Sequence, residues 1–168
     1  TTQAGFNTYD SELIVDNVRL NNVLLSDGGF ENPVTIQENG EGWKFIEQAV
    51  NYIHSKSFIS TATRDILVIG VESGFSLAFD AIDSVATTLG LNYDIVNDDE
   101  ISSVRFSDYR MLYVPSNSFN VSGGIRASEQ DLLTNRRNEI QTYVRNGGGL
   151  VALTDEGSGA AAGPYAWL

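Results

Sequence analysis

The chain has 168 residues, with 22 acidic side chains against 10 basic ones and a formal net charge of -12. This length suits one domain with a sizeable core, and the acidic balance argues against nucleic acid or an anionic membrane surface as a partner, because both attract clustered basic residues. The chain contains no cysteine, which excludes disulfides, thiolate zinc sites and cysteine nucleophiles within it. A composition that is acidic, poor in lysine and rich in Thr, Ser, Asn and Gly indicates an extracellular or cell-surface protein.

Residues 1–40 are rich in Asn, Asp and Gly and are predicted to form an N-terminal extension or the end of a preceding β module. Two short strands are expected, over 12–20 and 22–25. The stretch 14–20, followed by 28–31, is similar to the closing strand of carbohydrate-binding jelly rolls, which implies a glycan-binding module. The alternative is an edge hairpin that packs on the main domain.

Residues 41–168 are predicted to form one α/β domain, which opens with a helix over 41–58. Apolar residues at helical spacing give this helix one buried face, made of Trp43, Ile46, Ala49, Val50 and Ile53. The helix carries His54, which is the only histidine. A single histidine without a paired nucleophile is more typical of a helix end or surface than of a catalytic base.

The stretch 66–71 is apolar throughout, too short for a helix core and too uniform for a half-exposed strand. It therefore predicts a strand buried on both faces, as at the centre of a parallel sheet. A turn containing Gly70, Ser73 and Gly74 follows, and then apolar residues at three- and four-residue spacing predict a helix over 75–89, which ends at Gly90. This order of strand, turn and helix is the start of a βαβ unit.

Two more strands are predicted over 91–96 and 109–115. The acidic segment 97–100 offers oxygen ligands for Ca²⁺ but lacks the spacing of a calcium loop, so a solvated acidic loop is the favoured interpretation. Asn120 begins the tripeptide Asn120-Val121-Ser122, which makes it a candidate for N-glycosylation.

A helix over 128–146 is predicted to open with a capping box from Ser128 to Asp131 and to bury Leu133, Ile140 and Val144. Three glycines end it, and a fourth strand over 150–154 follows. Because crossovers in parallel sheets are right-handed, we expect four parallel strands in the order 2-1-3-4, with the helices 75–89 and 128–146 on opposite faces. The predicted fold is a flavodoxin-like three-layer α/β/α arrangement.

Residues 64–156 resemble the class I glutamine amidotransferase-like superfamily, which is flavodoxin-like. The matching segments are 66–70, 109–115 and above all 140–153, where a helix ends in three glycines before an apolar strand. Catalytic members carry a cysteine nucleophile in the turn after that strand. Here the matching position holds Thr154 or Asp155, and the family's partner His and Glu would come after Leu168. The resemblance therefore implies a member that lacks the nucleophile.

Ligands of open α/β sheets bind outside the carboxyl ends of the strands, at the switch point between the first strand and the third. The residues expected there are Glu72, Ser73, Ser116, Asn117, Thr154, Asp155 and Glu156. If the three carboxylates converge, one pKa should rise or the group should hold Ca²⁺ or Mg²⁺, which prefer oxygen ligands. The favoured alternative is that these residues are spread apart as turn and cap residues.

The function predicted from these observations is a non-catalytic structural or assembly domain, with no cofactor, which forms oligomers or filaments. Its expected partners are identical subunits or further segments of the polypeptide, and the apolar end 163–168 is predicted to be buried against them. The alternatives are a degenerate hydrolase at the carboxyl edge and a glycan-binding module. For the hydrolase, Ser73 and Ser158 lie near glycines but do not match the nucleophile-elbow motif.

Overall fold

The computed structural model describes residues 19–20, 23–24, 41–74, 76–118, 121–153 and 166–168. The chain divides into two compact units, Thr1–Gln37 and Glu38–Leu168. In the first unit, β1 (Arg19–Leu20) pairs antiparallel with β2 (Val23–Leu24), so a short hairpin lies within the two strands expected there.

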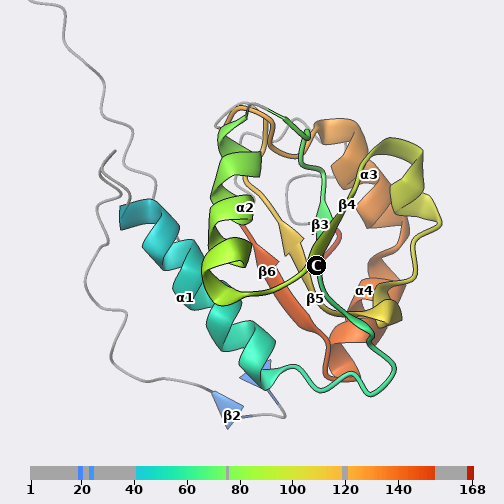
Figure 1. Ribbon diagram of the computed structural model, residues 1–168. Helices are drawn as coiled ribbons and strands as arrows, with labels where there is room; N and C mark the ends of the chain where they lie inside the picture. The colour runs from blue at the N-terminus through green and yellow to red at the C-terminus, as the bar shows by residue number, and fades with distance from the viewer. Residues whose placement is uncertain (1–18, 21–22, 25–40, 75, 119–120, 154–165) are drawn as a thin grey trace, which may run out of the picture. The chain divides into compact units, whose positions relative to one another are not determined.

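The second unit is built on a four-stranded parallel sheet in the order β4-β3-β5-β6 (Figure 1). Its strands are β3 (Arg64–Ile69), β4 (Tyr93–Val96), β5 (Tyr109–Val114) and β6 (Gly149–Ala152). On the central strand β3, Val68 aligns with Ile95 of β4 and with Tyr113 of β5. The predicted order and the parallel direction of all four strands are confirmed, and the fold is α/β and flavodoxin-like.

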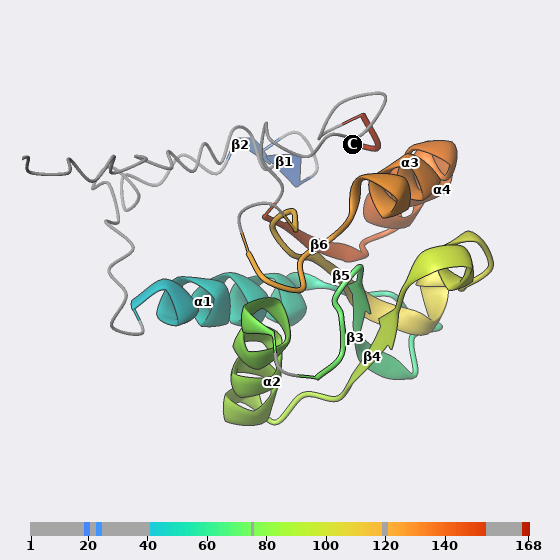
Figure 2. The same ribbon diagram turned by 90° about the horizontal axis from the view of Figure 1, so that it is seen from above.

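The alternation of side chains along β3 divides the core into two layers. Ile66 and Val68 pack in one layer with residues of α1 (Glu41–Lys56) and α2 (Leu77–Leu89). Leu67 and Ile69 pack in the other layer with residues of α3 (Ala127–Asn135) and α4 (Arg137–Arg145). Figure 2 shows α1 and α2 on one side of the sheet and α3 and α4 on the other, which confirms the opposite faces predicted for the helices 75–89 and 128–146. All four of these β3 side chains are fully buried, which explains their uniformly apolar character.

The connection from β4 to β5 contains two 3₁₀ helices, η1 (Asp98–Ser102) and η2 (Phe106–Asp108). Ile101 and Phe106 are buried in the same layer as α3 and α4. Helix α2 ends where predicted, because Gly90 at φ 67° donates its N–H to the carbonyls of Ala86 and Thr87.

The prediction of a single helix over 128–146 is wrong, because the helix is interrupted at Arg136, which separates α3 from α4. At the break, Arg136 has φ -103° and ψ 14°, and its side chain is held from outside these helices: Nη1 donates to the carbonyl oxygen of Ile101 at 2.6 Å, and the guanidinium lies 3.8 Å from the centre of the Phe106 ring. The expected burial of Val144 is also wrong, since it is 39 % exposed and Tyr143 is buried in its place.

The end of the chain was predicted to be buried against further segments of the polypeptide or identical subunits, and Trp167 is buried without either. Its side chain is fully buried within this chain, in the layer that contains Leu133 and Ile140. Leu168 is 40 % exposed, and its carbonyl oxygen accepts a hydrogen bond from Nε2 of Gln141 at 2.9 Å. The other residues of the apolar end, 163–165, lie outside the described residues. None of the described helices has both the length and the apolar character that crossing a bilayer requires.

Candidate functional site

The predicted site residues that the structure describes lie after β3 and after β5. Glu72 and Ser73 are exposed, Ser116 is half-buried and Asn117 is fully buried. The remaining predicted residues, Thr154, Asp155, Glu156 and the glycosylation candidate Asn120, lie outside the described residues. Convergence of the three carboxylates therefore stays a prediction.

The segment 122–125 lies against the residues that follow β3, beside the switch point between β3 and β5. The N–H of Glu72 donates to the carbonyl oxygen of Gly123 at 3.0 Å. Ile125 packs against Gly70, where an added Cβ would lie only 2.4 Å from Cγ1 of Ile125. Gly70 also has a φ of 74°, which favours glycine. The loop after β5 therefore contacts the end of β3, where ligands of such sheets bind.

The amino end of α2 is also occupied by the chain itself. Ser76 is the N-cap, and its Oγ accepts the N–H of Phe79 at 3.3 Å and donates to the carbonyl oxygen of Glu72 at 3.0 Å. The N–H of Ala78 donates to the carbonyl oxygen of Ser122 at 3.1 Å. Free N–H groups at a helix start are what binds an anion or stabilises an oxyanion. Here these donors are already engaged.

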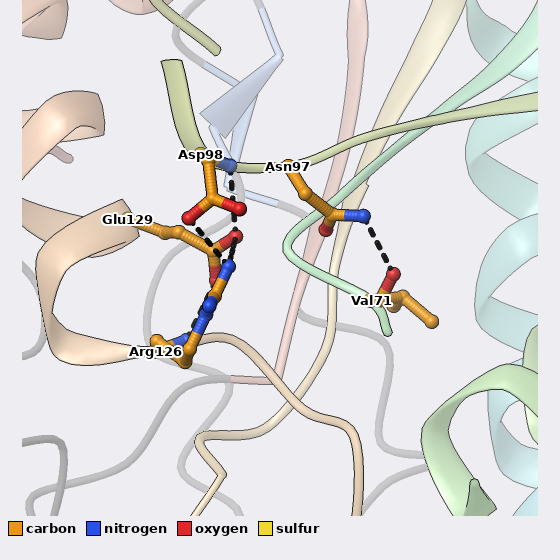
Figure 3. A network of polar contacts seen from close by, with 5 residues as sticks. All are labelled: Val71, Asn97, Asp98, Arg126 and Glu129. Carbon is orange, nitrogen blue, oxygen red and sulfur yellow. Dashed lines mark hydrogen bonds and ion pairs between the residues drawn. The ribbon is translucent and has the colours of Figure 1, made fainter. Parts of the chain in front are cut away.

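A charged network that the sequence did not predict lies at the same edge of the sheet (Figure 3). Glu129 is 1 % exposed, and its Oε1 accepts the N–H of Asp98 at 3.1 Å and Nη2 of Arg126 at 2.9 Å. Its Oε2 accepts the N–H of Arg126 at 2.9 Å. Nη2 of Arg126 also lies 2.6 Å from Oδ1 of Asp98. The hydrogen bonds to Glu129 and Asp98 raise the pKa of Arg126, so this side chain stays charged.

This network joins the end of β4 to the start of α3. Asp98 has a φ of 48°, a conformation that is uncommon for a residue other than glycine, and its N–H and carboxylate are both engaged. Beside it, Nδ2 of Asn97 donates to the carbonyl oxygen of Val71 at 3.0 Å, which joins the ends of β4 and β3 (Figure 3). The network therefore holds three loops in place at the carboxyl edge.

The predicted capping box was placed two residues too late. The N-cap of α3 is Arg126, and Glu129 is the acidic residue that returns to it. Only half of a capping box is present: Glu129 accepts the N–H of Arg126, but the Arg126 side chain has no acceptor atom for the N–H of Glu129, and an N-cap other than Ser or Thr is what hid this start.

The acidic segment 97–100 does not gather its oxygens around one point. Asp98 pairs with Arg126, while Asp99 and Glu100 are exposed. Across the described part of the chain, no group of three or more His, Cys, Asp or Glu side chains is arranged to hold a metal ion.

No family model, curated protein or solved structure gives a match to this sequence. The resemblance to amidotransferase-like proteins therefore stays a prediction that rests on the sequence, whereas the parallel sheet in its expected order is a property of the structure.

Proposed function

We propose that the unit Glu38–Leu168 is a non-catalytic structural domain of an extracellular or cell-surface protein, and that it assembles with further copies of itself. The observation that carries this proposal is the contact of the segment 122–125 with the end of β3 and the start of α2. The carbonyl oxygens of Ser122 and Gly123 take up N–H groups of Ala78 and Glu72 that a substrate or an oxyanion would need.

The position of the only histidine supports the absence of a hydrolytic site at Ser73. His54 contacts Asp65, the second residue of β3, whereas Ser73 follows the opposite end of that strand. A strand of six residues spans about 20 Å. A serine nucleophile needs its general base within hydrogen-bond reach, so His54 cannot activate Ser73.

Assembly is supported by the surface beside β6. Among the described strands, β6 pairs with β5 alone and is therefore an edge strand. Next to it lies a mainly apolar hollow of about 290 Å³, whose lining includes Ile140, Val144, Leu150 and Leu168. An edge strand beside apolar surface is a place where another chain adds to a sheet.

The absence of catalysis is tested with the full chain on a generic ester and on glutamine. We expect no hydrolysis above buffer, and no change in Ser73→Ala or Ser158→Ala. We also expect little loss of folding in Asp155→Asn and Glu156→Gln. Hydrolysis of the ester that disappears in either serine variant would replace the structural proposal with the hydrolase.

Assembly is tested by sedimentation velocity over a range of protein concentrations. We expect concentration-dependent oligomers that Val144→Glu weakens, because the change places a charge in the apolar hollow. Leu77→Glu is the matched control, since Leu77 is 58 % exposed at the start of α2 and does not line the hollow. A chain that stays monomeric at every concentration, or equal weakening in both variants, would contradict assembly through this face.

A further inference from the structure

The sheet of the second unit has an edge strand on each side. Among the described strands, β6 pairs with β5 alone and β4 pairs with β3 alone. Along a parallel ladder, every second residue of an edge strand directs its N–H and carbonyl groups toward the neighbouring strand, and the residues between them direct these groups outward. An edge strand can therefore accept the backbone of another chain.

On β6, the backbone groups that face outward belong to Leu150 and Ala152. The N–H of Leu153, just after the strand, donates to the carbonyl oxygen of Val114 on β5. Counting back by two residues places Val151 toward β5 as well, so Leu150 and Ala152 face away from it. The side chains of both outward residues are half-buried, and no residue of β6 is charged. The strand thus offers an uncharged edge.

On β4, the backbone groups that face outward belong to Tyr93 and Ile95. The carbonyl oxygen of Val96 accepts the N–H of Gly70, which follows β3. By the same alternation, Tyr93 and Ile95 face away from β3, and their side chains are also half-buried. Each edge strand has four residues, so the two edges match in length.

The surroundings of β4 are acidic. Residues 77–104, which include α2, β4 and η1, contain six carboxylates and neither Lys nor Arg. Two of the six, Asp94 and Asp98, are paired with arginines from other parts of the chain. Asp99 and Glu100 lie in η1, just after β4, where they are exposed and form no ion pair with a described residue. This edge therefore carries negative charge that nothing described here neutralises.

The surroundings of β6 carry the opposite charge, although the chain as a whole has a net charge of -12. Helix α4 leads into this strand and carries Arg137 and Arg145, which are exposed and form no ion pair with a described residue. Arg145 lines the apolar hollow beside β6, and Arg137 lies about two turns earlier on the same face of the helix. The one carboxylate of α4, on Glu139, is paired with Arg136. Helix α1, which also contacts β6, has two Glu and two Lys.

We propose that copies of the chain assemble head to tail, with the β6 edge of one copy against the β4 edge of the next. Such a contact presupposes the assembly proposed above and specifies its two surfaces. Two β4 edges would bring Asp99 and Glu100 of both copies together, and two β6 edges would oppose Arg137 and Arg145 to themselves. Like charges across a contact are costly, and opposite charges select the partner. Only the mixed contact joins two outward-facing backbones with opposite charges beside them.

This contact does not use the same surface on both copies. A pair formed in this way keeps a free β4 edge at one end and a free β6 edge at the other. Further copies can therefore add at both ends, which produces an open chain or, if the rotation closes, a ring. A contact of β6 with β6 would instead stop at a dimer.

The test uses sedimentation velocity on two full-chain variants with reversed charges. One is Arg137→Glu/Arg145→Glu, beside β6, and the other is Asp99→Lys/Glu100→Lys, beside β4. Each variant alone should self-associate about ten-fold more weakly than wild type, because the contact loses about two exposed ion pairs. An equimolar mixture should recover the oligomers, since the reversed edges of the two variants again carry opposite charges. Circular dichroism shows that each variant is folded, and the milder Arg137→Gln/Arg145→Gln should give a smaller weakening.

Glu72→Lys/Asp108→Lys is the matched control, with the same change in net charge as the β4 variant. Glu72 follows β3 and Asp108 precedes β5, so both lie at the inner strands and not at an edge. Wild-type association of the β4 variant on its own, or a mixture no better than its components, would overturn the head-to-tail contact and leave assembly itself standing. A wild-type chain that is monomeric at every concentration would contradict both.

Discussion

Nε2 of His54 lies 3.1 Å from Oδ1 of Asp65, and this contact joins the last turn of α1 to the start of β3. Oδ2 of the same carboxylate accepts the N–H of Asn92 at 3.0 Å. Burial by itself would raise the pKa of Asp65, but the N–H of Asn92 and the His54 ring outweigh burial and hold the pKa below its usual value. The histidine that the sequence placed at a helix end or on the surface lies in the last turn of α1 and helps to hold α1 on the sheet.

Asp65→Asn should lower the free energy of unfolding by about 1 kcal/mol at pH 7, because the amide offers only one acceptor oxygen to two donors. A carboxyl with a lower pKa in the folded chain than in the unfolded chain stabilises the fold above the unfolded value and loses this effect as pH falls through the folded value. The difference between wild type and variant should thus shrink as pH falls below about 4. Urea denaturation over this pH range measures it. Asp99→Asn, a change at an exposed carboxylate, is the control, and an equal pH response in both variants would contradict the assignment.

Glu129→Gln should destabilise the fold by about 3 kcal/mol, because it removes the charge that faces Arg126 and turns a donor toward N–H groups. Glu139→Gln is the matched control: Glu139 also pairs with an arginine three residues away, but its side chain is 60 % exposed, so the loss should stay below about 1 kcal/mol. Chemical denaturation of both variants gives the comparison. Similar losses of unfolding free energy in the two variants would mean that the buried Glu129 contributes no more to stability than the exposed Glu139.

Gln130→Met should raise the free energy of unfolding by about 1 kcal/mol. Gln130 is fully buried, and neither Nε2 nor Oε1 has a hydrogen-bond partner among the described residues. Methionine has a similar shape and removes the cost of burying these two polar atoms. Gln48→Met, at an exposed position of α1, should change little. A loss of stability in Gln130→Met would show instead that the buried amide has a partner, such as an ordered water.

Trp167→Ala should cost about 3–5 kcal/mol, since it leaves a cavity in the layer between the sheet and α3–α4. Leu168→Ala should change stability by no more than about 0.5 kcal/mol, because Leu168 is already 40 % exposed. Thermal and urea unfolding followed by circular dichroism compares the two variants. If Trp167→Ala unfolds like wild type, the end of the chain does not belong to this core.

The sequence by itself determined the type and order of the main elements of the second unit. The apolar run 66–71 predicted a strand buried on both faces, and β3 covers its first four residues, 66–69, while Gly70 and Val71 follow the strand. The spacing of apolar residues determined α1 and α2, and right-handed crossovers then led to the order β4-β3-β5-β6. These signals are either local in the sequence or follow from the right-handedness of crossovers in parallel sheets. They can therefore be recognised without knowing which residues are in contact in the folded chain.

Only the tertiary structure decided where α3 and α4 begin and end, what the loop after β5 contacts and where the end of the chain lies. At the break between α3 and α4, Arg136 contacts Ile101, 35 residues away, and at the start of α3 Arg126 contacts Asp98, 28 residues away. The loop after β5 meets the end of β3 where Gly123 meets Glu72, and Trp167 is buried in the same core layer as residues of α3 and α4. Each of these contacts joins residues that are distant in sequence. The local pattern of polar and apolar residues shows which groups need a hydrogen-bond partner or burial, but it does not show which distant residue provides it.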